Sequence, residues 1–88
     1  MEFKEYFKFL KLEKVKRKNA EELNESERYF YTIQLLDSEN NPCRFLIFNK
    51  DLINKVVSLQ LVGLQDIVCY IKVSYSNDKW QVNLIDIN

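Results

Sequence analysis

The stretch Asp51–Leu59, with the sequence DLINKVVSL, decides the fold of this chain. Its apolar residues follow a spacing of i, i+1, i+4 and i+5: Leu52, Ile53, Val56 and Val57. This spacing places them in one stripe along a short helix. Asp51 stands where a helix N-cap belongs. We therefore expect one short helix here, closing one open end of a barrel.

The rest of the chain consists of apolar runs that read as β-strands, separated by polar turn clusters. Three runs precede the helix and two follow it: Tyr6–Lys18, Arg28–Asp37, Cys43–Asn49, Gln65–Ser74 and Trp80–Ile87. The alternation of the first run slips at Phe9-Leu10, which indicates a β-bulge. Asn19–Glu27 is polar and acidic and is expected to be a loop or a flexible hairpin tip, and Ser76-Asn77-Asp78 is expected to be a hairpin turn.

The position of the helix, between the third and the fourth strand, selects among the small β folds. A ubiquitin-like fold has its helix after the second strand, SH3-like barrels have no equivalent helix, and a ferredoxin-like fold needs two. We therefore expect an all-β fold with one short helix: a five-stranded oligonucleotide/oligosaccharide-binding (OB) barrel, order β-β-β-α-β-β. Residues 1–88 are expected to form this single domain.

The composition argues against catalysis. The chain has no histidine, which removes the commonest general base and metal ligand, and its single glycine cannot build a phosphate loop. Cys43 and Cys69 lie inside predicted strands and are expected to be buried thiols in a reduced chain. We expect no enzyme, no metal and no cofactor. The charged N-terminus and the lack of a long apolar run lead us to expect a cytoplasmic protein without a membrane partner.

The net charge is zero, but the charges are segregated along the chain. Residues 1–20 carry seven basic and three acidic side chains, a balance of +4, and residues 21–42 carry one basic and six acidic, a balance of −5. Zero net charge counts against a general nucleic-acid binder. A local basic face can still attract phosphates.

The strands combine basic and aromatic residues, the combination that binds single-stranded nucleic acid through phosphate contacts and base stacking. The candidate binding residues are Lys14, Lys16, Arg17, Lys18, Phe30, Arg44, Phe48, Tyr70 and Lys72.

Each candidate also has a purely structural alternative. Phe30 and Phe48 could be core residues, and Tyr70 could be a half-buried barrel tyrosine. The basic run 14–18 could be a solvated strand end that blocks aggregation. Trp80 is expected in the core or as an end plug. The acidic loop 19–27 could be a solvating tip, or it could imitate nucleic acid and cover the groove until a ligand displaces it.

The chain resembles small phage and plasmid single-stranded-DNA-binding proteins, similar to the filamentous-phage gene V protein. The resemblance lies in the hydrophobic and turn pattern of strands two to five: Tyr29-x-Tyr31-x-Ile33-x-Leu35-x-Asp37, Pro42-x-x-Phe45-x-Ile47, Asp66-Ile67-Val68-x-Tyr70-x-Lys72-Val73 and Trp80-x-Val82-x-Leu84-Ile85-Asp86. It implies an OB barrel, usually a homodimer, that coats DNA cooperatively during replication. The acidic loop Asn19–Glu27 departs from the basic wing that this family would place there.

Two functions are therefore expected. The first is non-catalytic binding of single-stranded DNA, or of RNA, in replication or transfer of a phage, plasmid or mobile element. The second is a protein-interaction or oligomerisation module on the same fold, with a homodimer or a partner protein and no nucleic acid. Net neutrality favours the second, and the aromatic and basic strand residues favour the first.

Overall fold

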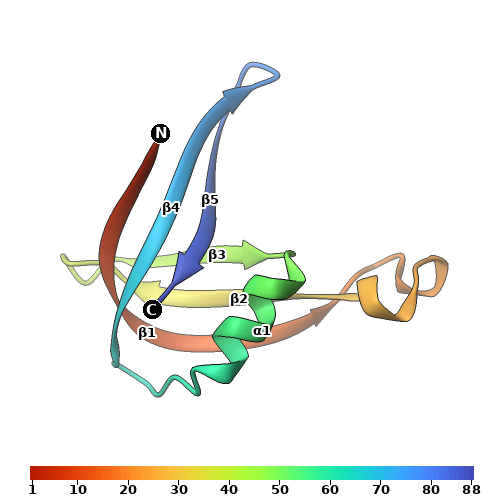
Figure 1. Cartoon of the computed structure of the whole chain (residues 1–88), viewed down its shortest axis with the longest axis horizontal. Coiled ribbons are helices and arrows are strands. Elements are labelled where there is room, and N and C mark those ends of the chain that lie inside the picture. Colours follow the sequence, from red (N-terminus) through yellow and green to blue (C-terminus); the bar gives the residue numbers. More distant parts are fainter.

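Five antiparallel strands form one strongly curled sheet that resembles half a barrel (Figure 1). The computed structural model describes residues 1–88. The sheet order is β3-β2-β1-β4-β5. The strands are β1 (Glu2–Lys16), β2 (Tyr29–Leu36), β3 (Pro42–Ile47), β4 (Asp66–Ser76) and β5 (Lys79–Ile87). One α-helix, α1 (Lys50–Ser58), lies between β3 and β4, and two 3-10 turns, η1 (Ala20–Glu22) and η2 (Glu25–Glu27), lie between β1 and β2.

The central strand β1 pairs with a different neighbour along each half of its length. From Glu2 to Lys8 it pairs with β4, and from Lys8 to Lys16 it pairs with β2. The register with β2 shifts between Phe9 and Lys11, which confirms the bulge predicted at Phe9-Leu10. A bulge bends a strand and increases its twist. The sheet can therefore curl around its core at this point.

The core lies inside the curl of the sheet and is formed by alternate residues of each strand. Its twelve buried members are Phe7, Phe9, Ile33, Leu35, Ile47, Leu52, Val56, Ile67, Cys69, Ile71, Leu84 and Ile87. Both cysteines carry free thiols, Cys69 buried and Cys43 half-buried. Burial, together with the neighbouring Cys43 and Glu5, raises the pKa of Cys69 to about 12. Cys69 therefore behaves as a small apolar core residue.

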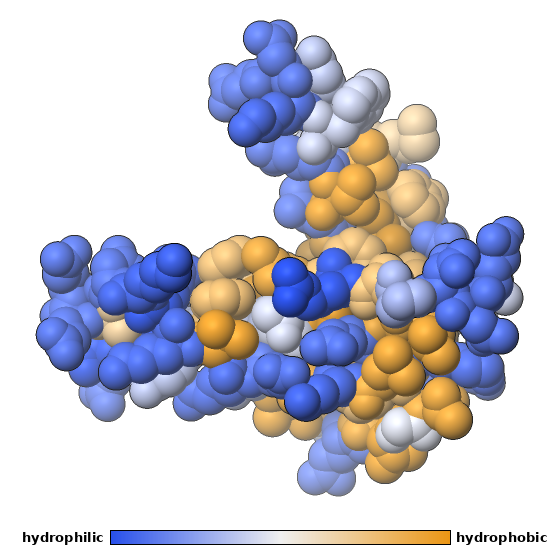
Figure 2. All heavy atoms as spheres, turned by 180° about the vertical axis from the view of Figure 1, so that it is seen from behind, coloured by the Kyte–Doolittle hydropathy of each residue, from blue (hydrophilic) through white to orange (hydrophobic).

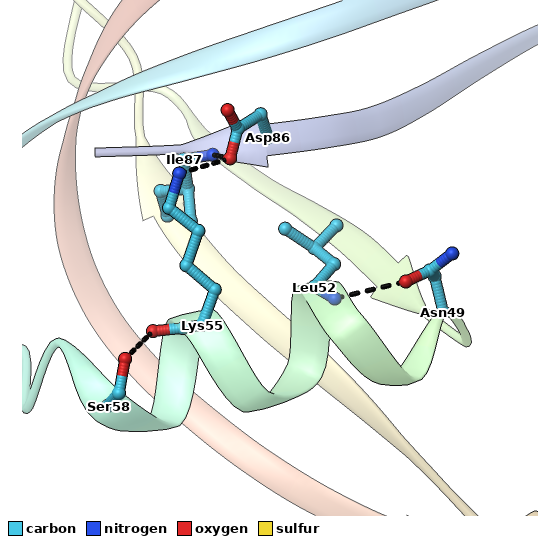
Figure 3. Close-up of polar contacts among 6 residues, drawn as sticks. All are labelled: Asn49, Leu52, Lys55, Ser58, Asp86 and Ile87. Carbon is cyan, nitrogen blue, oxygen red and sulfur yellow. Dashed lines mark hydrogen bonds and ion pairs between the residues drawn. The ribbon is translucent and has the colours of Figure 1, made fainter.

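The helix begins two residues earlier than a cap at Asp51 would predict, and its N-cap is Asn49. The Asn49 Oδ1 accepts a hydrogen bond from the Leu52 N–H at 3.0 Å (Figure 3). The prediction that Asp51 is the cap was wrong. Asp51 lies in the first turn, where its negative charge interacts favourably with the helix dipole. Leu52 and Val56 enter the core, whereas Val57, expected in the same stripe, is 48 % exposed.

The ends of the two hairpins lie outside the curled core. The segment 19–27, expected to be a loop or a flexible hairpin tip, joins the antiparallel strands β1 and β2. It contains the turns η1 and η2, so the observed order of elements differs from the predicted one by these turns. Ala20 of η1 is buried. The hairpin turn between β4 and β5 is present as predicted, with positive φ at Asn77 (50°) and Asp78 (59°). These angles suit a two-residue type I′ turn.

Two parts of the chain project from the body of the molecule (Figure 1). One is the end of the β4–β5 hairpin, and the other is the segment with η1 and η2. The radius of gyration is 13.8 Å, compared with about 12 Å for a compact domain of this length. The projecting segments account for the excess.

One ion pair fastens α1 to β5. The Lys55 Nζ lies 2.6 Å from the Asp86 Oδ1, which also accepts the Ile87 N–H at 2.9 Å (Figure 3). These two hydrogen bonds lower the pKa of Asp86 from its ordinary 3.8, and the bond from Lys55 has the larger effect. Because the pKa is lower in the folded state, the pair stabilises the fold above pH 3.8. This stability is lost as the pH falls through the folded-state pKa.

We expect Asp86→Asn to lower stability at neutral pH by less than about 1 kcal/mol, since the pair is half-exposed. As the pH is lowered from neutral through the folded-state pKa of Asp86, the difference from the unmodified chain should vanish, because the carboxyl is then protonated in both the folded and unfolded states. Thermal unfolding followed by circular dichroism across this pH range measures both effects. An equal difference at acid and neutral pH would contradict this account of the ion pair.

Candidate nucleic-acid interface

The outer face of β2 and β3 carries a stacked aromatic pair, of which Phe48 is exposed and Phe30 half-buried. Tyr31, Ile33 and Leu35 of β2 face the core, so Phe30, Thr32 and Gln34 lie on the opposite face of the sheet, where Thr32 is buried by its neighbours and the other two are half-buried. In the β2–β3 ladder Tyr31 lies opposite Ile47. Phe30 and Phe48 are the next pair along, and their rings stack with centroids 5.0 Å apart and planes inclined by 24°.

Arg17 extends this pair into a stack of three. Its backbone N–H donates to the carbonyl of Arg28 at 2.8 Å, which fixes the chain just beyond the end of β1. Its guanidinium carbon lies 5.0 Å from the centroid of the Phe48 ring. The Arg17 Nε is buried and has no hydrogen-bond partner. We call Arg17, Phe48 and Phe30 the outer stack.

The outer stack belongs to the surface. Neither phenylalanine is among the residues of the core cluster, Phe48 is 51 % exposed and Phe30 is half-buried. Leu46, on the same face, is 48 % exposed. This face therefore offers aromatic and apolar surface next to a permanent positive charge. Such a surface can stack a base and contact its phosphate.

The other candidate residues are spread over several places. Arg44 lies on the same outer face, opposite Gln34, but four residues along β3 from Phe48. Tyr70 and Lys72 lie on the outer face of β4, where their ladder partners are Lys4 and Glu2. Since β1 separates β4 from β2 in the sheet, this pair is not part of the outer stack.

The basic run 14–18 is divided between the two faces of the sheet. Lys14 and Lys16 lie opposite Tyr31 and Tyr29, on the side away from the outer stack. The Lys14 Nζ lies 4.4 Å from the centroid of the Tyr29 ring. Lys16, Arg17 and Lys18 line a small depression together with Glu21 and Glu22 of the η1 turn. The end of the run therefore lies beside acidic residues, and Lys14 lies apart from it.

None of the basic side chains in the run 14–18 forms an ion pair. The three ion pairs of the chain are Lys8–Asp66, Lys11–Glu13 and Lys55–Asp86. The acidic residues of η1 and η2 thus leave these cations unpaired.

Two further groups of residues were missed in the sequence. Tyr29, Tyr31 and Lys50 line a depression of about 270 Å³ together with Lys14. At the end of the β4–β5 hairpin the rings of Tyr75 and Trp80 lie 5.0 Å apart. The prediction that Trp80 is a core or end-plug residue was wrong, because it is 73 % exposed. The predicted Asn77-Asp78 turn sets Tyr75 opposite Trp80, so the turn itself was the signal for this pair.

Comparisons with protein-family models, with curated proteins and with solved structures gave no match to this chain. No helix of the structure is long and apolar enough to cross a membrane. No three histidine, cysteine or acidic side chains come together in an arrangement that could hold a metal ion. The geometry of the outer face is therefore the main observation that bears on function.

The surface position of the outer stack can be tested through stability. We expect Phe48→Ala to lower the free energy of unfolding by less than about 1 kcal/mol, because half of its side chain is already in water. The matched change Ile33→Ala, in the core, should cost about 2–5 kcal/mol. Urea unfolding measures both values. A cost for Phe48→Ala as large as that for Ile33→Ala would mean that Phe48 supports the core.

Proposed function

We propose that this chain is a non-catalytic single-stranded nucleic-acid-binding protein that holds its ligand on the outer face of β2 and β3. The outer stack is the observation that carries the proposal. A base stacked on Phe48 or Phe30 would gain about 1–3 kcal/mol. The Arg17 guanidinium, next to the ring, would contact the phosphate of the same nucleotide.

We also propose that the curled sheet is an OB-type barrel. The order β3-β2-β1-β4-β5, with α1 between β3 and β4, supports this assignment. The two end strands β3 and β5 are also in contact, as they must be where a barrel closes. OB barrels bind oligonucleotides on the face of strands 2 and 3, which is the face that carries the outer stack. The resemblance to phage and plasmid DNA-binding proteins makes single-stranded DNA the preferred ligand.

The direct test is fluorescence anisotropy with a labelled oligo-dT of about 16 nucleotides. We expect binding at about 50 mM salt and roughly tenfold weaker binding at about 200 mM, because only two or three cations face the ligand. The same titration with oligo-rU gives the preference for DNA or RNA. No binding at the lower salt would exclude this proposal and favour an interaction module without nucleic acid.

Phe48→Ala should weaken oligo-dT binding by roughly 5- to 150-fold, which corresponds to the loss of one stacked base. Tyr6→Ala is the matched control, because Tyr6 is 62 % exposed but lies on β1 opposite Val68 of β4. The control should bind as tightly as the unmodified chain. Equal affinities of all three proteins would show that the outer stack does not contact the ligand.

Arg17→Gln should change the salt dependence rather than only the affinity. One phosphate contact on a single strand contributes about 0.7 to the slope of log K against log salt, so the slope should fall by about that amount. Lys72→Gln, on the outer face of β4, should leave the slope unchanged. A changed slope for Lys72→Gln and an unchanged one for Arg17→Gln would show instead that the phosphates of the ligand contact β4.

A further inference from the structure

The depression that contains Tyr29 and Tyr31 lies on the face of β2 opposite the outer stack. Because side chains alternate along a strand, Phe30 lies on one face and its two neighbours lie on the other. Three parts of the chain enclose the depression: the β1–β2 hairpin, η2 and α1 (Figure 1). Its volume is about 270 Å³, at the lower end of the range of about 300–1,000 Å³ that is usual for small-molecule sites.

The deeper residues of the depression are apolar or aromatic, and the exposed ones are polar. Tyr31 and Ile53 are half-buried and pack against the core cluster. Lys50, Ile53 and Asn54 stand at positions i, i+3 and i+4 of α1, which places them on one face of the helix. Tyr29 is 39 % exposed, so its ring offers a flat surface to a ligand.

The polar side chains around the depression have no partner within the chain. Neither Lys14 nor Lys50 takes part in an ion pair, and the Lys14 ammonium lies over the Tyr29 ring. The side chains of Asn54 and Glu25 make no hydrogen bond. Two cations, one carboxylate and one amide therefore surround a tyrosine ring with their donors and acceptors free.

We propose that this depression binds one adenine nucleotide. Lys14 and Lys50 supply the positive charge for its phosphate, and Tyr29 supplies a ring against which the base can stack. An asparagine amide has the donor and the acceptor that match N7 and N6 of adenine, and a carboxylate such as Glu25 accepts from an exocyclic amino group. Thymine has no such amino group.

The charge and the surroundings of the depression suit a small anionic ligand. Lys14 and Lys50 outnumber Glu25, so the lining has a balance of +1. The projecting segment with η1 and η2, which forms one wall, is hydrophilic on the side seen in Figure 2. Because the depression and the outer stack lie on opposite faces of β2, this proposal does not depend on DNA binding by the outer stack.

An NMR titration of the isotope-labelled full chain with adenosine monophosphate tests the site. We expect shifts at Tyr29 and Asn54 and a dissociation constant of about 0.1–1 mM. Thymidine monophosphate should bind roughly tenfold more weakly, since it cannot donate an amino group to Asn54 or Glu25. The absence of binding up to about 5 mM, or equal affinity for the two monophosphates, would overturn the proposal.

The same chemistry could come from a free nucleotide or from the end of a strand. Titration of Phe48→Ala with oligo-dA that has a phosphorylated end separates the two sources, because the outer stack of this variant is impaired. In either case Tyr29 and Asn54 should shift. Tighter binding of the monophosphate assigns the site to a free nucleotide, and tighter binding of oligo-dA assigns it to a strand end.

Variants separate this site from the outer stack. Lys50→Gln should weaken binding of adenosine monophosphate roughly tenfold and leave binding of adenosine unchanged, because only the phosphate contacts the lysine. Asn54→Ala should remove most of the preference for adenine. Lys79→Gln, at an exposed lysine of β5, is the matched control and should bind normally.

The outcome with Phe48→Ala distinguishes failure of this proposal from failure of DNA binding. This variant should bind adenosine monophosphate as tightly as the unmodified chain. Loss of nucleotide binding in Phe48→Ala, together with full binding in Lys50→Gln, would place the nucleotide on the outer stack and overturn the proposal. A chain that binds adenosine monophosphate in the depression but no oligo-dT would support this site and reject only the proposed DNA binding.

Discussion

The bend of β1 at Phe9 is the constraint on which the rest of the structure depends. The Phe9 N–H donates to the Gln65 carbonyl at 2.8 Å, and the Phe9 carbonyl accepts from the Leu64 N–H at 2.6 Å. These bonds hold the segment before β4 against β1 at the point where β1 turns from β4 to β2. Leu64 takes a positive φ of 66° to make its bond, a conformation that costs a non-glycine residue free energy. Without this junction the two halves of the sheet could not enclose one core.

The bend also separates the cationic end of β1 from the β4–β5 hairpin. Because β1 changes partners, its C-terminal end brings Arg17 to the β2–β3 face, while its N-terminal half supports the β4–β5 hairpin. The Met1 N–H and carbonyl reach Val73 of this hairpin, at 3.0 and 2.7 Å. One long strand therefore holds a cationic stack at one end and an apolar hairpin at the other.

The sequence predicted the elements whose pattern is set by burial and turn chemistry. The alternation of β2 and β4, the bulge and the Asn77-Asp78 turn could be inferred because each depends on neighbouring residues. The cap at Asn49 was missed because Asp51, two residues later, is an equally good cap by type and only the backbone selects between them. Trp80 was misplaced because its burial depends on how far the hairpin extends beyond the core. Likewise, the meeting of Arg17 with Phe48 depends on strand register, which the residue types alone do not specify.

The two edge strands of the sheet, β3 and β5, differ in how well they are protected against pairing with a further strand. β3 is short, begins with Pro42 and carries Arg44, and a proline and charges are the usual means by which an edge strand avoids pairing. β5 has nine residues, no proline, and exposed apolar side chains along its free part. β3 is therefore the protected edge of the sheet, and β5 is the less protected one.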